Sequence, residues 1–193
     1  GLGNQFLGHI RGVDAIAHVV RLFQDPDVVH VDGKLDPVGD LETILTELML
    51  ADLEMLEKRR DKAHKLARSN DPEAKLEFET IRDLADQLAE GRTPVYDKEN
   101  PKVVELVRSL GLLTVMPAFV CANTDEESFR NFDSDPRAQK LKEFAAGHHM
   151  EVVPVCAKLE EELGQLEPEE AAMFMEELGI AETAFIRLIH TGY

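Results

Sequence analysis

The sequence PAFVCANTDEESF at positions 117–129 decides the fold of this chain. It begins with an apolar run, Pro117–Ala122, and becomes polar from Asn123 to Glu126. A buried parallel strand has this composition, because it is apolar on both faces and polar where its carboxyl end meets the crevice of the sheet. The stretch therefore predicts a buried strand followed by a loop that carries Asn123 and Glu126.

A second stretch repeats this design further along the chain. The apolar residues Val152–Val155 are followed by Cys156, Ala157 and Lys158, which form a loop with small residues. Parallel strands bring their carboxyl ends to the same edge of a sheet. We therefore expect the two loops to lie side by side and to form the floor and the wall of a site for one nucleotide base.

The spacing of apolar residues predicts the surrounding elements. Leucines at three- and four-residue steps indicate a long helix from Asp40 to Arg68. Asp71 and Pro72 begin a second helix that runs to Gly91, so the two helices form an antiparallel hairpin. The remaining expected elements are strands at 13–21, 115–122 and 151–155, and helices at 101–110, 135–146, 158–163, 169–178 and 182–190. This alternation predicts an α/β fold with a mainly parallel sheet.

Composition limits the classes of partner. The net charge of −17 over 193 residues disfavours nonspecific attraction to nucleic acid or to acidic membranes. No run of apolar residues reaches membrane-spanning length, and the start of the chain has no signal-peptide pattern. One local cluster is basic, and it suits either the polar surface of a helical arm or a contact with RNA: Lys58, Arg59, Arg60, Lys62, Lys65 and Arg68.

The two cysteines and the missing phosphate motif limit the kinds of ligand that this sequence can bind by itself. Cys121 and Cys156 fall in or beside predicted buried strands, so we expect small core residues rather than a disulfide or a metal pair. The sequence contains no G-x-x-x-x-G-K-[ST] phosphate loop and no D-x-x-G segment ahead of a strand. A nucleotide bound by these residues alone would lack most of its phosphate anchoring.

The polar residues after the central strand allow two interpretations. Guanine offers two adjacent donors that suit a short Asp, whereas adenine offers one exocyclic donor beside a ring acceptor. Glu126 is longer by one methylene and would not be placed like Asp, while the Asn123 amide can serve an exocyclic amine. The alternative is an ordinary strand-end turn with solvated acids. His30, in an acidic loop at 25–33, can orient water or hold a phosphate, or it is simply an exposed loop residue.

Taken together, these residues resemble the middle of the Obg-like ATPases of the YchF type, a branch of the translation-factor-related P-loop NTPases. The similarity spans essentially the whole chain. The segments that carry it are GLGNQFL at 1–7, DAIAHVVRLF at 14–23, VVHVDG at 28–33, TELMLADLE at 46–54, NTDE at 123–126, VPVCA at 153–157, and FMEELG at 174–179 through HTGY at 190–193.

The resemblance implies a cytoplasmic, ribosome-associated switch protein that hydrolyses ATP in preference to GTP, with Mg²⁺. It implies no membrane partner and no sequence-specific DNA partner. A loop histidine takes the catalytic part in that family, and this role maps onto His30. The base-side residues map onto Asn123, Thr124, Glu126, Cys156, Ala157 and Phe23.

The resemblance also divides the chain. Residues 1–37 and 95–193 correspond to part of a G-type nucleotide-binding domain, and residues 38–94 to an inserted helical arm with coiled-coil character. The phosphate loop and the Mg²⁺ ligands are expected before Gly1 and a TGS domain after Tyr193, so we expect no metal ligands in this chain, no activity from it alone, and an uncovered face on its sheet. A non-enzymatic module whose hairpin docks a partner, and a GTPase, remain as alternatives.

Overall fold

The structure is a computed structural model that describes residues 2–23, 35–68, 71–178 and 183. Two compact units are present, and we describe each by itself. The helical unit comprises Gly1–Asp14 and Glu42–Met116, and the sheet unit comprises Ala15–Leu41 and Pro117–Tyr193. The predicted helix at 182–190 and the loop that contains His30 lie outside the described residues.

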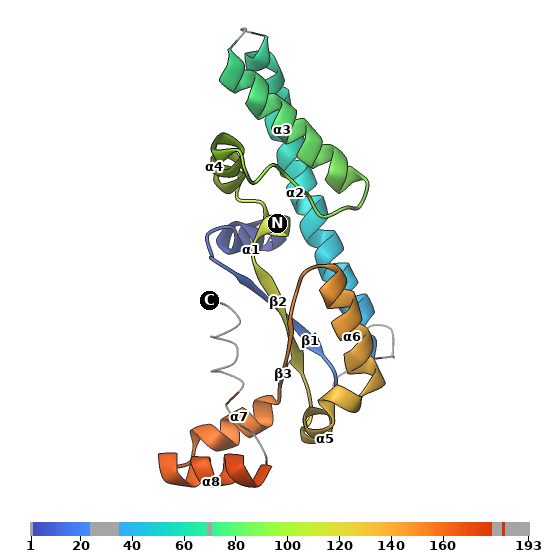
Figure 1. The fold of residues 1–193 in the computed structure, drawn as a ribbon, viewed down its shortest axis with the longest axis vertical. Helices are drawn as coiled ribbons and strands as arrows, with labels where there is room; N and C mark the ends of the chain where they lie inside the picture. Colours follow the sequence, from blue (N-terminus) through green and yellow to red (C-terminus); the bar gives the residue numbers. More distant parts are fainter. Residues whose placement is uncertain (1, 24–34, 69–70, 179–182, 184–193) are drawn as a thin grey trace. The chain divides into compact units, whose positions relative to one another are not determined.

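The sheet unit is built on three parallel strands (Figure 1). Their order is β1-β2-β3, with β1 at Ile16–Arg21, β2 at Ala118–Asn123 and β3 at Val152–Val155. The helices of this unit are α5 (Glu126–Arg130), α6 (Pro136–Gly147), α7 (Ala157–Gly164) and α8 (Pro168–Leu178), and a 3₁₀ turn, η2, spans Phe132–Ser134. The predicted α/β class with a mainly parallel sheet is therefore confirmed.

Burial along the strands follows their place in the sheet. The central strand β2 is buried at its four inner positions, as its continuous apolar run predicts. In contrast, β1 alternates: Ile16, His18 and Val20 are buried, while Ala17 and Val19 are exposed. Val19 is 63% exposed, and the expectation of an uncovered face on the sheet stays a prediction. Helix α6 packs against β2 and β3.

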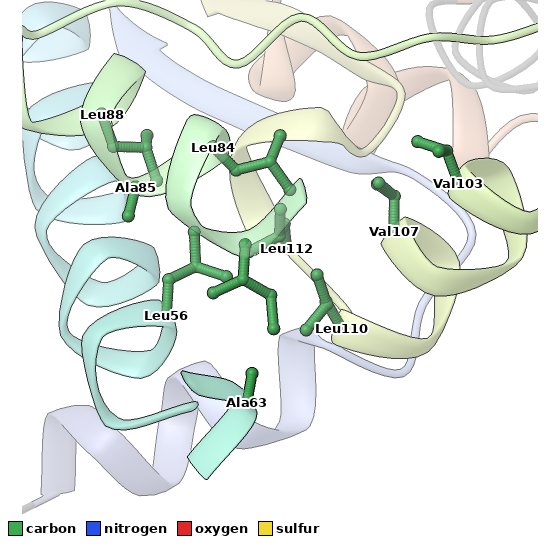
Figure 2. Close-up of a cluster of buried hydrophobic side chains, with 10 residues drawn as sticks. Leu56, Ala63, Leu84, Ala85, Leu88, Val103, Val107, Leu110 and Leu112 are labelled. Atoms are coloured by element: carbon green, nitrogen blue, oxygen red, sulfur yellow. The ribbon is translucent and has the colours of Figure 1, made fainter. Parts of the chain in front are cut away.

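The helical unit contains α1 (Leu2–Ile10), α3 (Pro72–Ala89), α4 (Pro101–Leu110), the 3₁₀ turn η1 (Leu113–Val115), and α2 (Pro37–Ala67) from Glu42 onward. Its core is one cluster of buried side chains, shown in Figure 2, from α2, α3, α4 and the segment after α4. Arg59 pairs with Glu77, and the rings of His64 and Phe78 lie 5.1 Å apart. Together with the shared cluster, these contacts confirm that α2 and α3 pack side by side as a hairpin.

Short polar signals set the helix starts. Asp71 accepts a hydrogen bond from Glu73 N, Asn100 from Lys102 N, and Asp135 from Arg137 N, and a proline follows each capping residue. Helix α4 ends at Gly111, whose φ of 60° is a left-handed conformation that glycine adopts without strain.

Several boundaries differ from the sequence prediction, and α2 begins at Pro37 rather than at Asp40. β1 begins at Ile16 rather than at 13, because α1 runs to Ile10 and a turn follows it. β2 begins at Ala118, because residues 113–115 form η1. Glu126 was expected on a loop, but it is the first residue of α5, since Asp125 caps that helix.

The compact units do not follow the predicted domain division, because α1 and α4 group with the hairpin. The division into 1–37 with 95–193 and 38–94 is a division by function and stays a prediction. Within the described part of the chain, every helix is too short or too polar to cross a membrane.

Candidate nucleotide-base site

The carboxyl ends of the three strands meet at one edge of the sheet. Asn123 is opposite Arg21 of β1 on one side and opposite Val155 of β3 on the other. Leu22 N donates to Asn123 O over 2.7 Å, and Thr124 N donates to Val155 O over 2.8 Å. The loops after β2 and β3 therefore lie side by side, as predicted, and the residues that follow β1 join them.

Asn123 is the central polar residue of this edge. It is partly exposed, and its backbone carbonyl is already bonded to Leu22 N. Among the described residues, no hydrogen bond engages its side-chain amide. An amide so placed offers one acceptor and two donors to a ligand.

Thr124 joins the two loops. It is 4% exposed, and its hydroxyl donates to Val155 O over 3.1 Å, the same oxygen that accepts from its backbone N–H. Both donors of Thr124 are thus occupied within the sheet edge. A direct contribution of Thr124 to a base would use its carbonyl oxygen.

The first two acidic residues after Thr124 are engaged by protein donors. Asp125 Oδ1 accepts from Ser128 N over 2.7 Å and caps α5. Glu126 Oε1 lies 2.7 Å from Lys158 Nζ. The hydrogen bond from Lys158 and its positive charge lower the pKa of the Glu126 carboxyl, and the same bond raises the pKa of Lys158.

The loop after β3 presents helix α7 to this edge. Cys156 is buried at the N-cap, and its side chain makes no capping hydrogen bond, while Ala157 is exposed. Uncapped N–H groups at the first turn of a helix lack an intrahelical acceptor. Cys121 and Cys156 are free and buried, which confirms them as core residues, and burial raises the pKa of the Cys121 thiol.

Phe23 follows β1 at the same edge. Its ring is partly buried, and Arg21 Cζ lies 5.7 Å from the ring centroid. His30 lies outside the described residues. In the described part of the chain, no group of three or more His, Cys, Asp or Glu side chains could hold a metal ion.

The sequence prediction gave Lys158 no role of its own, although it closes the loop of small residues after β3. Glu126 and Lys158 are far apart in the sequence, and only the parallel register of β2 and β3 brings them together. A lysine followed by Glu160, Glu161 and Glu162 looks like part of a solvated helix face, so no sequence signal indicated its partner.

Comparisons with known proteins give a consistent picture, although no family model matches the chain. The chain is 45% identical over 196 residues to the "Ribosome-binding ATPase YchF" of Bacillus subtilis, covering 100% of the chain and 53% of that protein. It is 39% identical over 194 residues to the protein of the same name from Escherichia coli O157:H7, covering 100% of the chain and 52% of that protein. The chain thus spans about half the length of the curated relatives it matches.

A solved structure agrees with these relatives. The structure described as the Schizosaccharomyces pombe YchF GTPase superposes with a TM-score of 0.85 at 33% identity, covering 100% of this chain and 53% of that one. The parallel sheet, its flanking helices and the helical hairpin thus define a part of a G-domain-like α/β NTPase fold. Within that class, the chain is similar over its whole length to about half of the length of these YchF proteins.

Proposed function

We propose that this chain supplies the base-recognition part of the nucleotide site in an ATP-hydrolysing switch protein that acts at the ribosome in the cytoplasm. Asn123 is the residue that carries the proposal. Its unengaged side-chain amide lies where the ends of β1, β2 and β3 meet. Ligands of open α/β sheets bind in the crevice at this end of the strands.

The chemistry of the Asn123 side chain suits adenine. An asparagine amide can accept a hydrogen bond from the exocyclic amine of adenine and donate one to an adjacent ring nitrogen. The exposed start of α7 at Ala157 adds backbone N–H groups, because the N-cap residue Cys156 makes no capping hydrogen bond with its side chain. Phe23 offers an aromatic surface for the face of the base. Thr124 serves mainly by holding the loops of β2 and β3 together.

The phosphate chemistry requires groups beyond these. In the full-length protein that carries this sequence, Mg²⁺ and a phosphate-binding loop would neutralise the charge that develops on the transferred phosphoryl group. Within this chain, His30 is proposed to orient the attacking water. We propose no metal ligand among the residues described here.

The helical hairpin is proposed to be the arm that contacts the ribosome. A groove of about 480 Å³ lies beside its basic residues and is lined by Met55, Lys58, Arg59, Lys62, Ala63, Leu66 and Glu77. Lys58 pairs with Glu54 and Arg59 pairs with Glu77, so part of this charge is balanced locally. Lys62 and Lys65 are exposed, and they are the side chains best placed to meet phosphate groups of RNA.

The test uses the full-length protein that carries this sequence. We expect Asn123→Ala to weaken ATP binding about three- to tenfold, the effect of losing one or two hydrogen bonds to the base. Asn131→Ala is the matched control, because Asn131 binds Glu127 O at the end of α5 and takes no part in the site. ATP affinity that is the same in Asn123→Ala and the wild type contradicts the proposal. Absence of any nucleotide binding by the wild type favours a non-enzymatic partner-binding module.

GTP hydrolysis is the second candidate function, because the superposable S. pombe structure is described as a GTPase. Competition between ATP and GTP for the wild-type protein separates the two. Tighter binding of GTP than of ATP contradicts our reading of the base site and favours the GTPase.

A further inference from the structure

The ion pair between Glu126 and Lys158 joins the two loops of the base site. Glu126 is the first residue of α5, after β2, and Lys158 is the second residue of α7, after β3. Their side chains meet with Oε1 and Nζ 2.7 Å apart. This pair has no counterpart in the sequence prediction, which considered Glu126 alone.

We propose that Lys158 is a specificity-determining residue of the base site: by holding the Glu126 carboxylate on the protein, it keeps a second acceptor away from the base edge and so disfavours guanine. The inference rests on the proposed function, because it assumes that a purine binds beside Asn123. It adds a role for Lys158 and a physical origin for the choice between adenine and guanine.

The chemistry of the two bases explains why one carboxylate matters. Guanine presents a ring N–H and an exocyclic amine side by side, and a carboxylate with two free oxygens accepts from both. Adenine presents one exocyclic amine beside a ring nitrogen that is an acceptor. A free carboxylate beside that nitrogen would place two acceptors against each other, which is unfavourable. A site selects against a base when it leaves such groups unpaired.

The first two carboxylates after Thr124, those of Asp125 and Glu126, are engaged within the protein. The Asp125 carboxylate caps α5 through Ser128 N, so it is directed to the backbone of its own helix. The Glu126 carboxylate is held by Lys158. With both acids engaged, the Asn123 amide is the unengaged side-chain group of this loop, and an amide pairs well with adenine.

The backbone fixes the position from which Lys158 acts. Asn123 is opposite Val155 in the register of β2 and β3, and Thr124 bonds twice to Val155 O. Lys158 Nζ is also 3.9 Å from Glu162 Oε1, one turn further along α7. The lysine head is therefore placed between two carboxylates.

The expected effect is modest, because the pair is largely exposed to solvent. The side chain of Lys158 is 69% exposed and that of Glu126 is 37% exposed. Exposed ion pairs are weak, so removing Lys158 should shift the preference for ATP over GTP by about two- to fivefold rather than invert it completely.

The experiment measures dissociation constants for ATP and GTP in the full-length protein. In Lys158→Met, we expect the GTP-to-ATP ratio of Kd values to fall by about two- to fivefold, since the Glu126 carboxylate becomes free to accept from guanine. Lys158→Arg keeps the pair and should keep the wild-type ratio. Lys158→Met combined with Glu126→Gln should restore the ratio, a rescue that a purely structural role for Lys158 would not produce.

Lys142→Met is the matched control, because Lys142 pairs with Asp133 elsewhere in the sheet unit. An unchanged ratio in Lys158→Met, with ATP binding still weakened by Asn123→Ala, overturns this inference and leaves the proposed function intact. An equal loss of both affinities that Glu126→Gln does not rescue also overturns it. If ATP binds to Asn123→Ala as tightly as to the wild type, that result contradicts the proposed function itself.

Discussion

Arg11 and Asp52 form an ion pair in which the carboxylate is completely buried. Arg11 Nη1 lies 2.8 Å from Asp52 Oδ1, and the side chain of Asp52 is 0% exposed. The other oxygen of Asp52 accepts from both N and Oγ1 of Thr114, each over 2.8 Å. The same Arg11 atom donates to Gly111 O over 2.6 Å. This network ties together the residue after α1, helix α2 and the segment after α4 within the helical unit.

Loss of this network should destabilise the chain strongly. We expect Asp52→Ala to lower the free energy of unfolding by about 3 kcal/mol, because it leaves the partly buried guanidinium of Arg11 and the N–H of Thr114 without their acceptor. Thr114→Val removes only the hydroxyl and should cost about 1 kcal/mol. Urea unfolding of the chain measures both values.

Glu54→Ala is the control for that series, because Glu54 is on the same helix but 61% exposed and paired with Lys58. Its unfolding free energy should stay within about 0.5 kcal/mol of the wild type. Equal stability of Asp52→Ala and Glu54→Ala would show that the buried network contributes little.

The cap of α6 offers a second prediction. Asp135 accepts from Arg137 N over 2.8 Å and pairs with the Arg137 side chain, while its own side chain is 10% exposed. Asp135→Ala should cost about 1 kcal/mol, the usual effect of losing an N-cap. Asp133→Ala is the matched control, since Asp133 is 93% exposed and should change stability by less than about 0.5 kcal/mol.

The same aspartate should contribute to acid sensitivity. The hydrogen bond from Arg137 lowers the pKa of Asp135 below its ordinary value of 3.8. The folded state therefore binds this proton less readily than the unfolded state. The stability that Asp135 contributes is complete above pH 3.8 and is lost as the pH falls through the lowered pKa of the folded state. The difference in stability between wild type and Asp135→Ala should shrink over this acidic range. A difference that grows on acidification would contradict the assignment.

His18 should produce a pH effect closer to neutrality. It is 5% exposed on β1, and burial lowers its pKa from 6.5. On acidification the unfolded state takes up the proton first. The stability that the neutral, buried His18 contributes should therefore be complete above pH 6.5 and should decrease as the pH falls below that value. Unfolding free energies at several pH values should show a smaller slope for His18→Leu than for the wild type. His9→Gln changes an exposed histidine and should keep the wild-type slope.

His30 carries the catalytic prediction. In the full-length protein, His30→Ala should reduce ATP turnover with little loss of ATP affinity, because the proposed role is to orient water and not to bind the nucleotide. Steady-state hydrolysis and equilibrium binding measured on the same preparation separate the two quantities. Unchanged turnover would remove His30 from the mechanism.

The sequence allowed the sheet and the polar ends of its strands to be predicted because their signal is local. The apolar run at 117–122 followed by Asn123, and the similar run before Cys156, indicate buried strands and their polar ends without any knowledge of neighbours. The helix start at Asp71 and Pro72 is likewise a local signal, since the capping residue stands directly before a proline.

The parts that could not be predicted depend on tertiary context. Glu126 was expected on a loop because α5 is a single short turn with little periodicity. Asp52 is among the many charged residues of α2 and looks like part of a solvated face, yet its partners are Arg11 and Thr114, which are remote in the sequence. The pairing of Glu126 with Lys158 likewise follows from the register of β2 and β3.

The most direct test of the base site is a crystal structure of the full-length protein with a non-hydrolysable ATP analogue. We predict that the adenine lies at the shared edge of β1, β2 and β3, with its exocyclic amine about 3 Å from the side-chain oxygen of Asn123. Adenine bound at another place, with the Asn123 amide in contact with solvent only, would contradict the account.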